Sequence, residues 1–172
     1  MGVAAVARKG AAPPASENQT TMLVRKIPDG SVIDHIAAGK ALSVLRLLGD
    51  PQENGFTIAM VMNVSSSKMG KKDIVKVEGV EITPEQVQRL ALIAPKASVN
   101  IVRSYRVVAK ANAVPPRTLR GVLSCTAPTC VSVREKESAP SIFFLSSRTP
   151  LRYRCKYCGR ELSEKEISDQ LG

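Results

Sequence analysis

The chain has 172 residues, of which 44% are hydrophobic but only 3% aromatic, so one domain or two small ones must build their core from aliphatic side chains. The net charge of +10 is compatible with an anionic ligand, a nucleic acid or an acidic protein partner. No apolar run is long enough to span a bilayer, which excludes a helical membrane protein.

The first part of the chain predicts an arm followed by a short strand. Residues 1–21 are rich in Ala and polar residues and show no apolar periodicity, so we expect a disordered arm and not a signal peptide. Residues 23–27 predict a short strand, and residues 28–30 (Pro-Asp-Gly) predict a turn. Residues 32–36, which include the only histidine, His35, are expected to continue in extended conformation.

Two helices follow from apolar periodicity and from their end signals. Residues 39–48 carry leucines at three-residue steps, and the Gly-Asp-Pro sequence at 49–51 ends that helix. The second helix begins at a capping box, in which Thr83 is the N-cap residue and Gln86 is the third helical residue. Pro95 ends the second helix.

Four further strands are predicted around these helices. Residues 56–64 are strongly apolar, which predicts a strand covered on both faces. After a loop at 65–70, residues 71–78 alternate, so that Lys72 and Lys76 point to the same side. The order strand, helix, two strands, helix, two strands predicts an α+β domain of ferredoxin-like character, with the helices on one face of a mostly antiparallel sheet. The last two strands are expected at residues 99–102 and 105–110.

A second, small domain is predicted at 115–172, after a first domain at 22–114. Val114-Pro115-Pro116 is a stiff link, because consecutive prolines favour extended backbone. A domain this small has a marginal core, so a bound metal is expected to contribute much of its stability. Its predicted elements are a lead-in segment at 119–124, short strands at 131–134, 142–145 and 151–154, and a terminal helix at 162–170.

All four cysteines lie in this second domain, in two pairs. Four residues separate Cys125 from Cys130, and two separate Cys155 from Cys158. Two such turns joined by a hairpin offer four thiolates in a tetrahedron, which is the ligand set of a closed structural zinc site with no open catalytic position. Two disulfides or an iron centre are the alternatives. Because nothing marks the chain as secreted, we expect one structural Zn²⁺ per chain in a reducing cytoplasm.

No catalytic site is predicted. A nucleophile needs a base and an orienting partner, and no catalytic Ser or Cys accompanies His35, since the cysteines are assigned to the metal. The segment 69–73 has some likeness to a phosphate-binding loop, but it leads into a strand and not into a helix N-terminus. We therefore expect a protein that is not itself an enzyme.

Several motifs in register resemble the regulatory subunit of aspartate carbamoyltransferase. They extend from about residue 23 to about residue 165 and lie at 30–36, 69–73, 86–95, 99–110 and the four cysteines. The resemblance implies a ferredoxin-like allosteric domain that binds ATP and CTP, and a small all-β zinc-binding domain that docks on the catalytic chain. It also implies a non-catalytic chain that regulates the committed step of pyrimidine biosynthesis.

The resemblance further implies a nucleotide site. Lysines would supply cations to a triphosphate, and Asp34 would accept hydrogen bonds from a ribose or a base amino group. Without the resemblance, these lysines are ordinary exposed strand residues, and His35 and Tyr105 are ordinary structural residues. The implied site residues are Val24, Lys26, Ile27, Val32, Asp34, His35, Lys72, Lys76, Asn100, Val102, Tyr105, Val107 and Lys110.

Partners follow from the same interpretation. We expect a homodimer of regulatory chains that pair through residues 99–102, predicted as an edge strand with exposed backbone groups. We expect no nucleic-acid or membrane partner. The competing hypothesis, motivated by the charge of +10 and the four cysteines, is a zinc-ribbon nucleic-acid-binding protein, whose affinity would fall steeply with salt.

Overall fold

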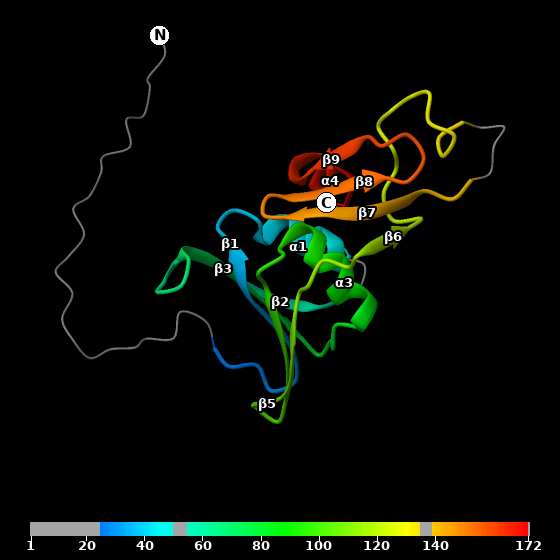
Figure 1. Ribbon diagram of the computed structural model, residues 1–172. Coiled ribbons are helices and arrows are strands. Elements are labelled where there is room, and N and C mark those ends of the chain that lie inside the picture. The colour runs from blue at the N-terminus through cyan, green and yellow to red at the C-terminus, as the bar shows by residue number, and fades with distance from the viewer. Residues whose placement is uncertain (1–24, 50–54, 135–138, 172) are drawn as a thin grey trace, which may run out of the picture.

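The computed structural model describes residues 25–49, 55–134 and 139–171 and contains two antiparallel sheets with helices between them (Figure 1). The predicted arm at 1–21 lies outside these residues. The first domain contains β1 (Gly30–Ala37), α1 (Ala41–Leu48), β2 (Thr57–Ser66), β3 (Gly70–Glu78), α3 (Pro84–Ile93), β4 (Ser98–Arg103) and β5 (Arg106–Asn112). The second contains β6 (Thr118–Arg120), β7 (Ile142–Arg148), β8 (Leu151–Cys155), β9 (Glu161–Ser163) and α4 (Glu164–Leu171).

The first sheet has the strand order β2-β3-β1-β4-β5, and all its neighbouring strands are antiparallel. Its inner face packs against α1 and α3, where Ile33, Val75 and Val99 are buried with Val44 and Leu90 of the helices. The predicted element order and the ferredoxin-like arrangement are confirmed. We call the opposite side of this sheet, on which Val32, Lys76 and Asn100 lie by strand alternation, the outer face.

The two helices begin in different ways. The predicted capping box of α3 is present: the Thr83 hydroxyl accepts from the Gln86 N–H at 3.3 Å, and the Gln86 side chain accepts from the Thr83 N–H at 2.9 Å. α1 has no side-chain cap of its own. Instead, the buried Asp73 carboxylate on β3 accepts from the N–H groups of Gly39 at 2.8 Å and Ala41 at 3.1 Å.

The predicted exposure of two strands is wrong. The apolar segment expected to be covered on both faces is β2, an edge strand of mostly exposed and half-buried residues. Residues 99–102, expected at an edge, belong to β4, which lies between β1 and β5. The described edge on that side is β5, whose seven residues are all exposed. The hydrophobicity of a segment predicts that it forms a strand, but it does not predict which strands lie beside it in the sheet. Strand order is set by contacts between residues far apart in the chain.

Two further predicted strands are not strands in the residues that the structure describes. Residues 25–27, the described part of the first one, pair with no strand. Lys76 Nζ donates to the Arg25 carbonyl at 2.8 Å, and the Tyr105 N–H donates to the Pro28 carbonyl at 2.8 Å. Residues 131–134 form turns that continue from Cys130, with the Val133 N–H bonded to the Cys130 carbonyl at 3.1 Å.

The second sheet has the order β6-β7-β8-β9. Its buried face carries Phe143, Leu151, Tyr153 and Leu162, and Leu92 of α3 packs into the same cluster. The predicted terminal helix is confirmed but begins at Glu164, because residues 161–163 pair with β8 as β9. Among the residues that the structure describes, no helix combines the length and apolar character needed to cross a membrane.

Candidate functional site

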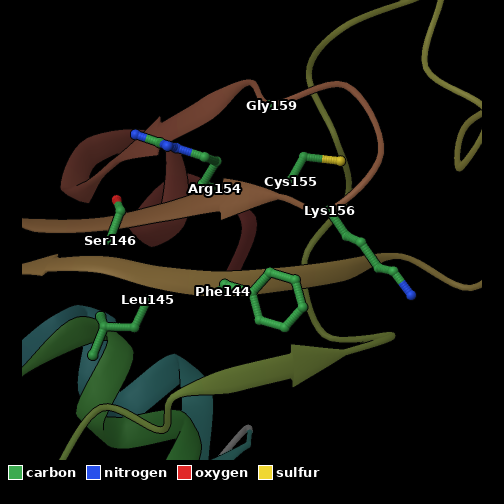
Figure 2. A pocket seen from close by; sticks show the side chains of 7 residues that line it. All are labelled: Phe144, Leu145, Ser146, Arg154, Cys155, Lys156 and Gly159. Carbon is green, nitrogen blue, oxygen red and sulfur yellow. The ribbon is translucent and has the colours of Figure 1, made fainter.

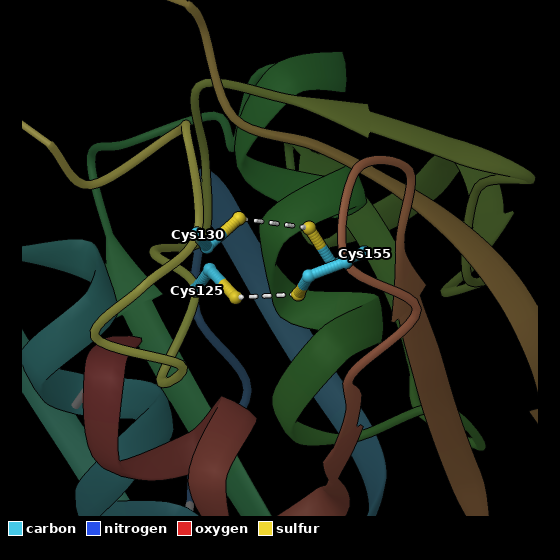
Figure 3. Close-up of side chains that lie close together, drawn as sticks. Cys125, Cys130 and Cys155 are labelled. Carbon is cyan, nitrogen blue, oxygen red and sulfur yellow. Dashed lines mark hydrogen bonds between the residues drawn. The ribbon is translucent and has the colours of Figure 1, made fainter. Parts of the chain in front are cut away.

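The four cysteines of the second domain converge on one point. Their sulfur atoms all lie within 4.8 Å of one another, with Cys125 Sγ 3.5 Å from Cys158 Sγ and Cys130 Sγ 3.7 Å from Cys155 Sγ (Figure 3). All four are free thiols, so the two-disulfide alternative is not what the structure contains. Three of them are buried and Cys158 is exposed.

Two turns position these thiols. The Cys130 N–H donates to the Ala127 carbonyl at 3.0 Å, which closes the first turn. In the second turn the Gly159 N–H donates to the Cys155 carbonyl at 3.1 Å, and Gly159 has φ of +75°, a conformation that glycine adopts without strain. The first turn carries Cys125 and Cys130, the second carries Cys155 and Cys158, and together they direct the four sulfur atoms toward a common centre.

The cluster has the dimensions of a four-thiolate metal site. Metal–sulfur bonds of about 2.3 Å in a tetrahedron place sulfurs about 3.8 Å apart, close to the distances of 3.5 and 3.7 Å found here. The Ser132 hydroxyl lowers the pKa of Cys130 to about 7, while burial raises the pKa of Cys125 to about 12. Thiols must lose protons to bind a metal, so metal binding would release protons here.

On the outer face of the first sheet, the strand register aligns residues that the resemblance marks. Val32 lies directly opposite Lys76 on one side and Asn100 on the other, and Asn100 lies opposite Lys110. Two lysines therefore flank an apolar and an amide side chain in one row across four strands. Val102, which is buried, continues this face toward the turn between β4 and β5.

A charge network lies beside this row at the end of β1. Lys72 Nζ is 2.7 Å from an Asp34 carboxylate oxygen, and the His35 N–H donates to Asp34 at 2.6 Å. His35 has φ of +59°, and its ring Nδ1 lies 3.3 Å from the Ser98 hydroxyl. Burial alone would raise the pKa of Asp34, but the bonds from Lys72 and His35 together lower it below its usual value.

A cavity of about 310 Å³ opens next to this network. It brings together two of the predicted residues, His35 and Lys110, with residues that sequence reasoning missed. Lys68 follows β2 in the turn before β3, and Lys96 lies in the turn between α3 and β4. No periodic pattern marks a turn lysine, so only the fold identifies the group. The remaining lining residues are Met69, Ser98 and Asn112.

The other predicted residues lie toward the opposite end of β1. Tyr105 and Val107 are 62% and 61% exposed, at and just after the turn between β4 and β5. Ile27 is buried and Lys26 is exposed. The bonds from Lys76 to the Arg25 carbonyl and from Tyr105 to Pro28 hold this segment at the same end of the sheet. Val24 lies outside the described residues.

A larger pocket of about 530 Å³ lies on the second domain, beside the cysteine cluster (Figure 2). Phe144 on β7 is 45% exposed there and lies opposite Arg154 on β8. Arg154 is paired with Glu161 at 2.9 Å. The pocket combines exposed aromatic surface with cationic side chains and is lined by Phe144, Leu145, Ser146, Arg154, Cys155, Lys156 and Gly159.

Comparison with known proteins gives consistent matches over both domains. Residues 22–114 match the family model for the aspartate carbamoyltransferase regulatory chain, allosteric domain, and residues 117–168 match the one for its metal binding domain. The chain is 46% identical over 155 residues to an aspartate carbamoyltransferase regulatory chain of Hyperthermus butylicus, covering 90% of this chain and 97% of the relative. It is 49% identical over 150 residues to the regulatory chain of Korarchaeum cryptofilum, and the match covers 87% of this chain and 96% of the relative. The regulatory chain of Thermofilum pendens is 50% identical over 150 residues, covering 87% and 94%.

Proposed function

The chain belongs to the family of aspartate carbamoyltransferase regulatory chains, and from this premise we propose that it binds ATP and CTP on the outer face of its first sheet. Regulatory chains are the non-catalytic subunits of an enzyme of pyrimidine biosynthesis, so the prediction that the chain is not an enzyme is confirmed. We propose residues 22–114 as the nucleotide-binding domain and residues 115–172 as the domain that binds zinc and docks on the catalytic chain.

The observation that carries the nucleotide proposal is the aligned row of Lys76, Val32, Asn100 and Lys110 beside a cavity rich in lysine. A triphosphate loses water only where fixed cations replace it. Asn100 can bond a base or ribose, and Val32 offers an apolar surface to a base. Asp34 has its charge compensated by Lys72, so it can accept from ribose hydroxyls without strongly repelling phosphate.

A binding titration tests this proposal. The full chain is titrated with CTP, ATP and cytidine, and CTP is then displaced by ATP to test for a shared site. Lys76→Ala and Lys110→Ala are each expected to lose about 1.5–3 kcal/mol of triphosphate affinity, the range for hydrogen bonds to charged groups, while cytidine binding changes little. Lys165→Ala, an exposed change on α4, is the control. Unchanged CTP affinity in both Lys76→Ala and Lys110→Ala would place the nucleotide site elsewhere.

We also propose that the four cysteines hold one structural Zn²⁺. Four thiolates and no additional ligand position suit a closed zinc site, and iron is the alternative that the same set could accept. Metal analysis of freshly purified protein is expected to give one zinc per chain. Removal by a chelator is expected to unfold the second domain, because its core is small, while the first sheet keeps its circular dichroism. Iron in place of zinc would refute the metal assignment.

Docking on the catalytic chain is proposed for the second domain. The pocket beside the cysteines carries an exposed aromatic ring, and aromatic residues and arginine dominate many interfaces. Phe144→Ala is expected to weaken association with catalytic subunits, as measured by analytical ultracentrifugation. Met60→Ala on the first sheet, also an exposed apolar residue, should leave association unchanged. Equal association of both variants would place the interface on another surface.

We propose a cytoplasmic protein without nucleic-acid or membrane partners. Lys68, Lys96 and Lys110, which have no ion pair among the described residues, lie around one cavity, which suits a small polyphosphate better than a duplex. A duplex-DNA titration at moderate salt beside the CTP titration separates the two hypotheses. Tight, strongly salt-dependent DNA binding with no response to CTP would favour the zinc-ribbon alternative.

A further inference from the structure

The cavity of about 310 Å³ at the end of β1 is lined by three lysines that come from three different elements. Lys68 lies in the turn between β2 and β3, Lys96 in the turn between α3 and β4, and Lys110 on β5. On a flat surface, the side chains of three lysines would point away from one another into solvent. Here the fold directs them at one volume, together with His35, Ser98 and Asn112, which carry further polar groups.

The charge of this cavity is not compensated by the protein. No Asp or Glu lines it, and within the described residues none of the three ammonium groups has an ion pair or a side-chain hydrogen bond. Lys72, by contrast, is held by Asp34 at 2.7 Å. Like charges brought together without an acid repel one another, and a bound anion relieves that repulsion.

The cavity is continuous with the proposed nucleotide site. It shares Lys110 with the row across the outer face, and it shares His35 with the Asp34 network. A nucleoside lying along Val32 and Asn100 would therefore direct its phosphates toward Lys110 and His35. Lys68 and Lys96 line the same cavity from the turns and would meet the outermost phosphates.

We infer that Lys68 and Lys96 bind the terminal phosphates of the nucleotide, so that the chain discriminates among nucleotides by the number of their phosphates. This inference rests on the proposed nucleotide site. It adds two turn residues, at the terminal phosphates, to the strand lysines Lys76 and Lys110 that the nucleotide proposal places against the triphosphate. The chain then responds to triphosphates more strongly than to the products of their hydrolysis.

The test is a set of calorimetric titrations of the full chain with CTP, CDP and CMP at constant ionic strength. Lys68→Gln and Lys96→Gln are each expected to weaken CTP binding about tenfold or more, the lower end for lost bonds to a charged group. The loss should be smaller for CDP and absent for CMP. Lys71→Gln is the matched control, because it removes the same charge from the exposed start of β3 and lies outside the cavity lining.

A fall in affinity of equal size for CTP, CDP and CMP overturns the inference, and so does unchanged CTP binding in both variants. Inorganic tripolyphosphate separates this result from the fate of the nucleotide proposal. If tripolyphosphate binds and depends on Lys68 and Lys96 while CTP does not bind, the phosphate role stands and the nucleotide proposal fails. If CTP binds and its affinity does not depend on Lys68 and Lys96, the nucleotide proposal stands and the phosphate role of these two lysines fails. If neither ligand binds, both proposals fail.

Discussion

Asp73 shows how one residue can link several elements. Its carboxylate is fully buried on β3, on the inner face that strand alternation assigns to it. It accepts from the N–H groups of Gly39 and Ala41, which precede and begin α1, and from the Asn63 N–H of β2 at 2.9 Å. Three backbone donors compensate the cost of burying this charge. The residue therefore replaces the missing side-chain cap of α1.

Replacing Asp73 by Ala is expected to lower the free energy of unfolding by at least about 3 kcal/mol, because three buried N–H groups lose their acceptor. Urea unfolding followed by circular dichroism measures the loss. Asp29→Ala is the control, since Asp29 accepts from the Ser104 N–H at an exposed position and should cost only about 1 kcal/mol. Equal losses in the two variants would contradict the linking role of Asp73.

Gly30 illustrates a steric limit at the start of β1. It has φ of +131°, and a Cβ added there would collide with the Val77 carbonyl oxygen of the neighbouring strand. Gly30→Ala is expected to cost at least about 2 kcal/mol in thermal or urea unfolding, because strain and a backbone clash add. Gly70→Ala, with φ of +70° but open space around it, should cost only about 1–2 kcal/mol. A Gly30 variant as stable as the Gly70 variant would show that the strands separate at little cost.

At the scale of elements, helix starts depend on short local signals. α3 uses the capping box of Thr83 and Gln86, and α4 uses a second one that sequence reasoning missed. There the Ser163 hydroxyl accepts from the Glu166 N–H at 3.3 Å, and the Glu166 carboxylate accepts from the Ser163 N–H at 2.8 Å and from the Ser163 hydroxyl at 2.7 Å. The pattern Ser-x-x-Glu was present in the sequence, but the expected helix start at residue 162 concealed it.

The capping box of α4 predicts a pH dependence of stability. The backbone and side chain of Ser163 lower the pKa of Glu166 to about 2. These bonds favour the charged carboxylate, so their contribution is complete above its unfolded pKa of about 4.3 and is lost as pH falls toward 2. Glu166→Ala is expected to cost about 1 kcal/mol at pH 6, and this difference should narrow by pH 3.

Urea unfolding at both pH values measures the effect of this substitution. Glu164→Ala removes an acid from the same first turn, and Glu164 makes no side-chain hydrogen bond among the described residues, so its effect should be smaller. A Glu166→Ala cost that stays constant from pH 6 to pH 3 would show that the carboxylate charge does not stabilise the helix.

At the scale of the whole molecule, the helices connect the two sheets. Figure 1 shows α1 and α3 between them. Leu92 of α3 is fully buried in the core of the second domain, and Lys40 Nζ lies 3.4 Å from the Ser168 hydroxyl of α4. Movement of the first sheet at a nucleotide site would therefore reach the second domain through packed side chains. If the second domain docks on a catalytic chain, as proposed above, these contacts would connect the nucleotide site with the docked chain.

The exposed edge of the first sheet predicts how two copies pair. All residues of β5 are exposed, including Val107 and Val108, and an edge strand with apolar side chains is a template for a second strand. We propose a homodimer through β5. Light scattering is expected to show a dimer for the full chain and a monomer for Val108→Lys, because like charges would meet across the strand pair. Leu42→Lys on α1 should remain dimeric. A dimeric Val108→Lys would exclude this edge.

Local patterns in the sequence predicted most of the helices and strands, the order of elements in the first domain and the cysteine pairs. The capping box at Thr83, the alternation of Lys72 and Lys76 and the spacing of Cys155 and Cys158 depend on neighbours within a few residues, so they could be predicted. The ferredoxin-like arrangement followed from element order because few topologies accommodate it.

Only the tertiary structure decided what depends on residues far apart in the chain. It placed β2 and β5 at the edges, because strand order is set by which long-range pairings bury the most surface. It placed Lys72 in an ion pair with Asp34, so the charge of this lysine is already compensated within the protein. It gathered Lys68, Lys96 and Lys110 around one cavity from three separate elements. Charges on turns carry no periodicity, so their convergence follows from the fold and not from any local pattern.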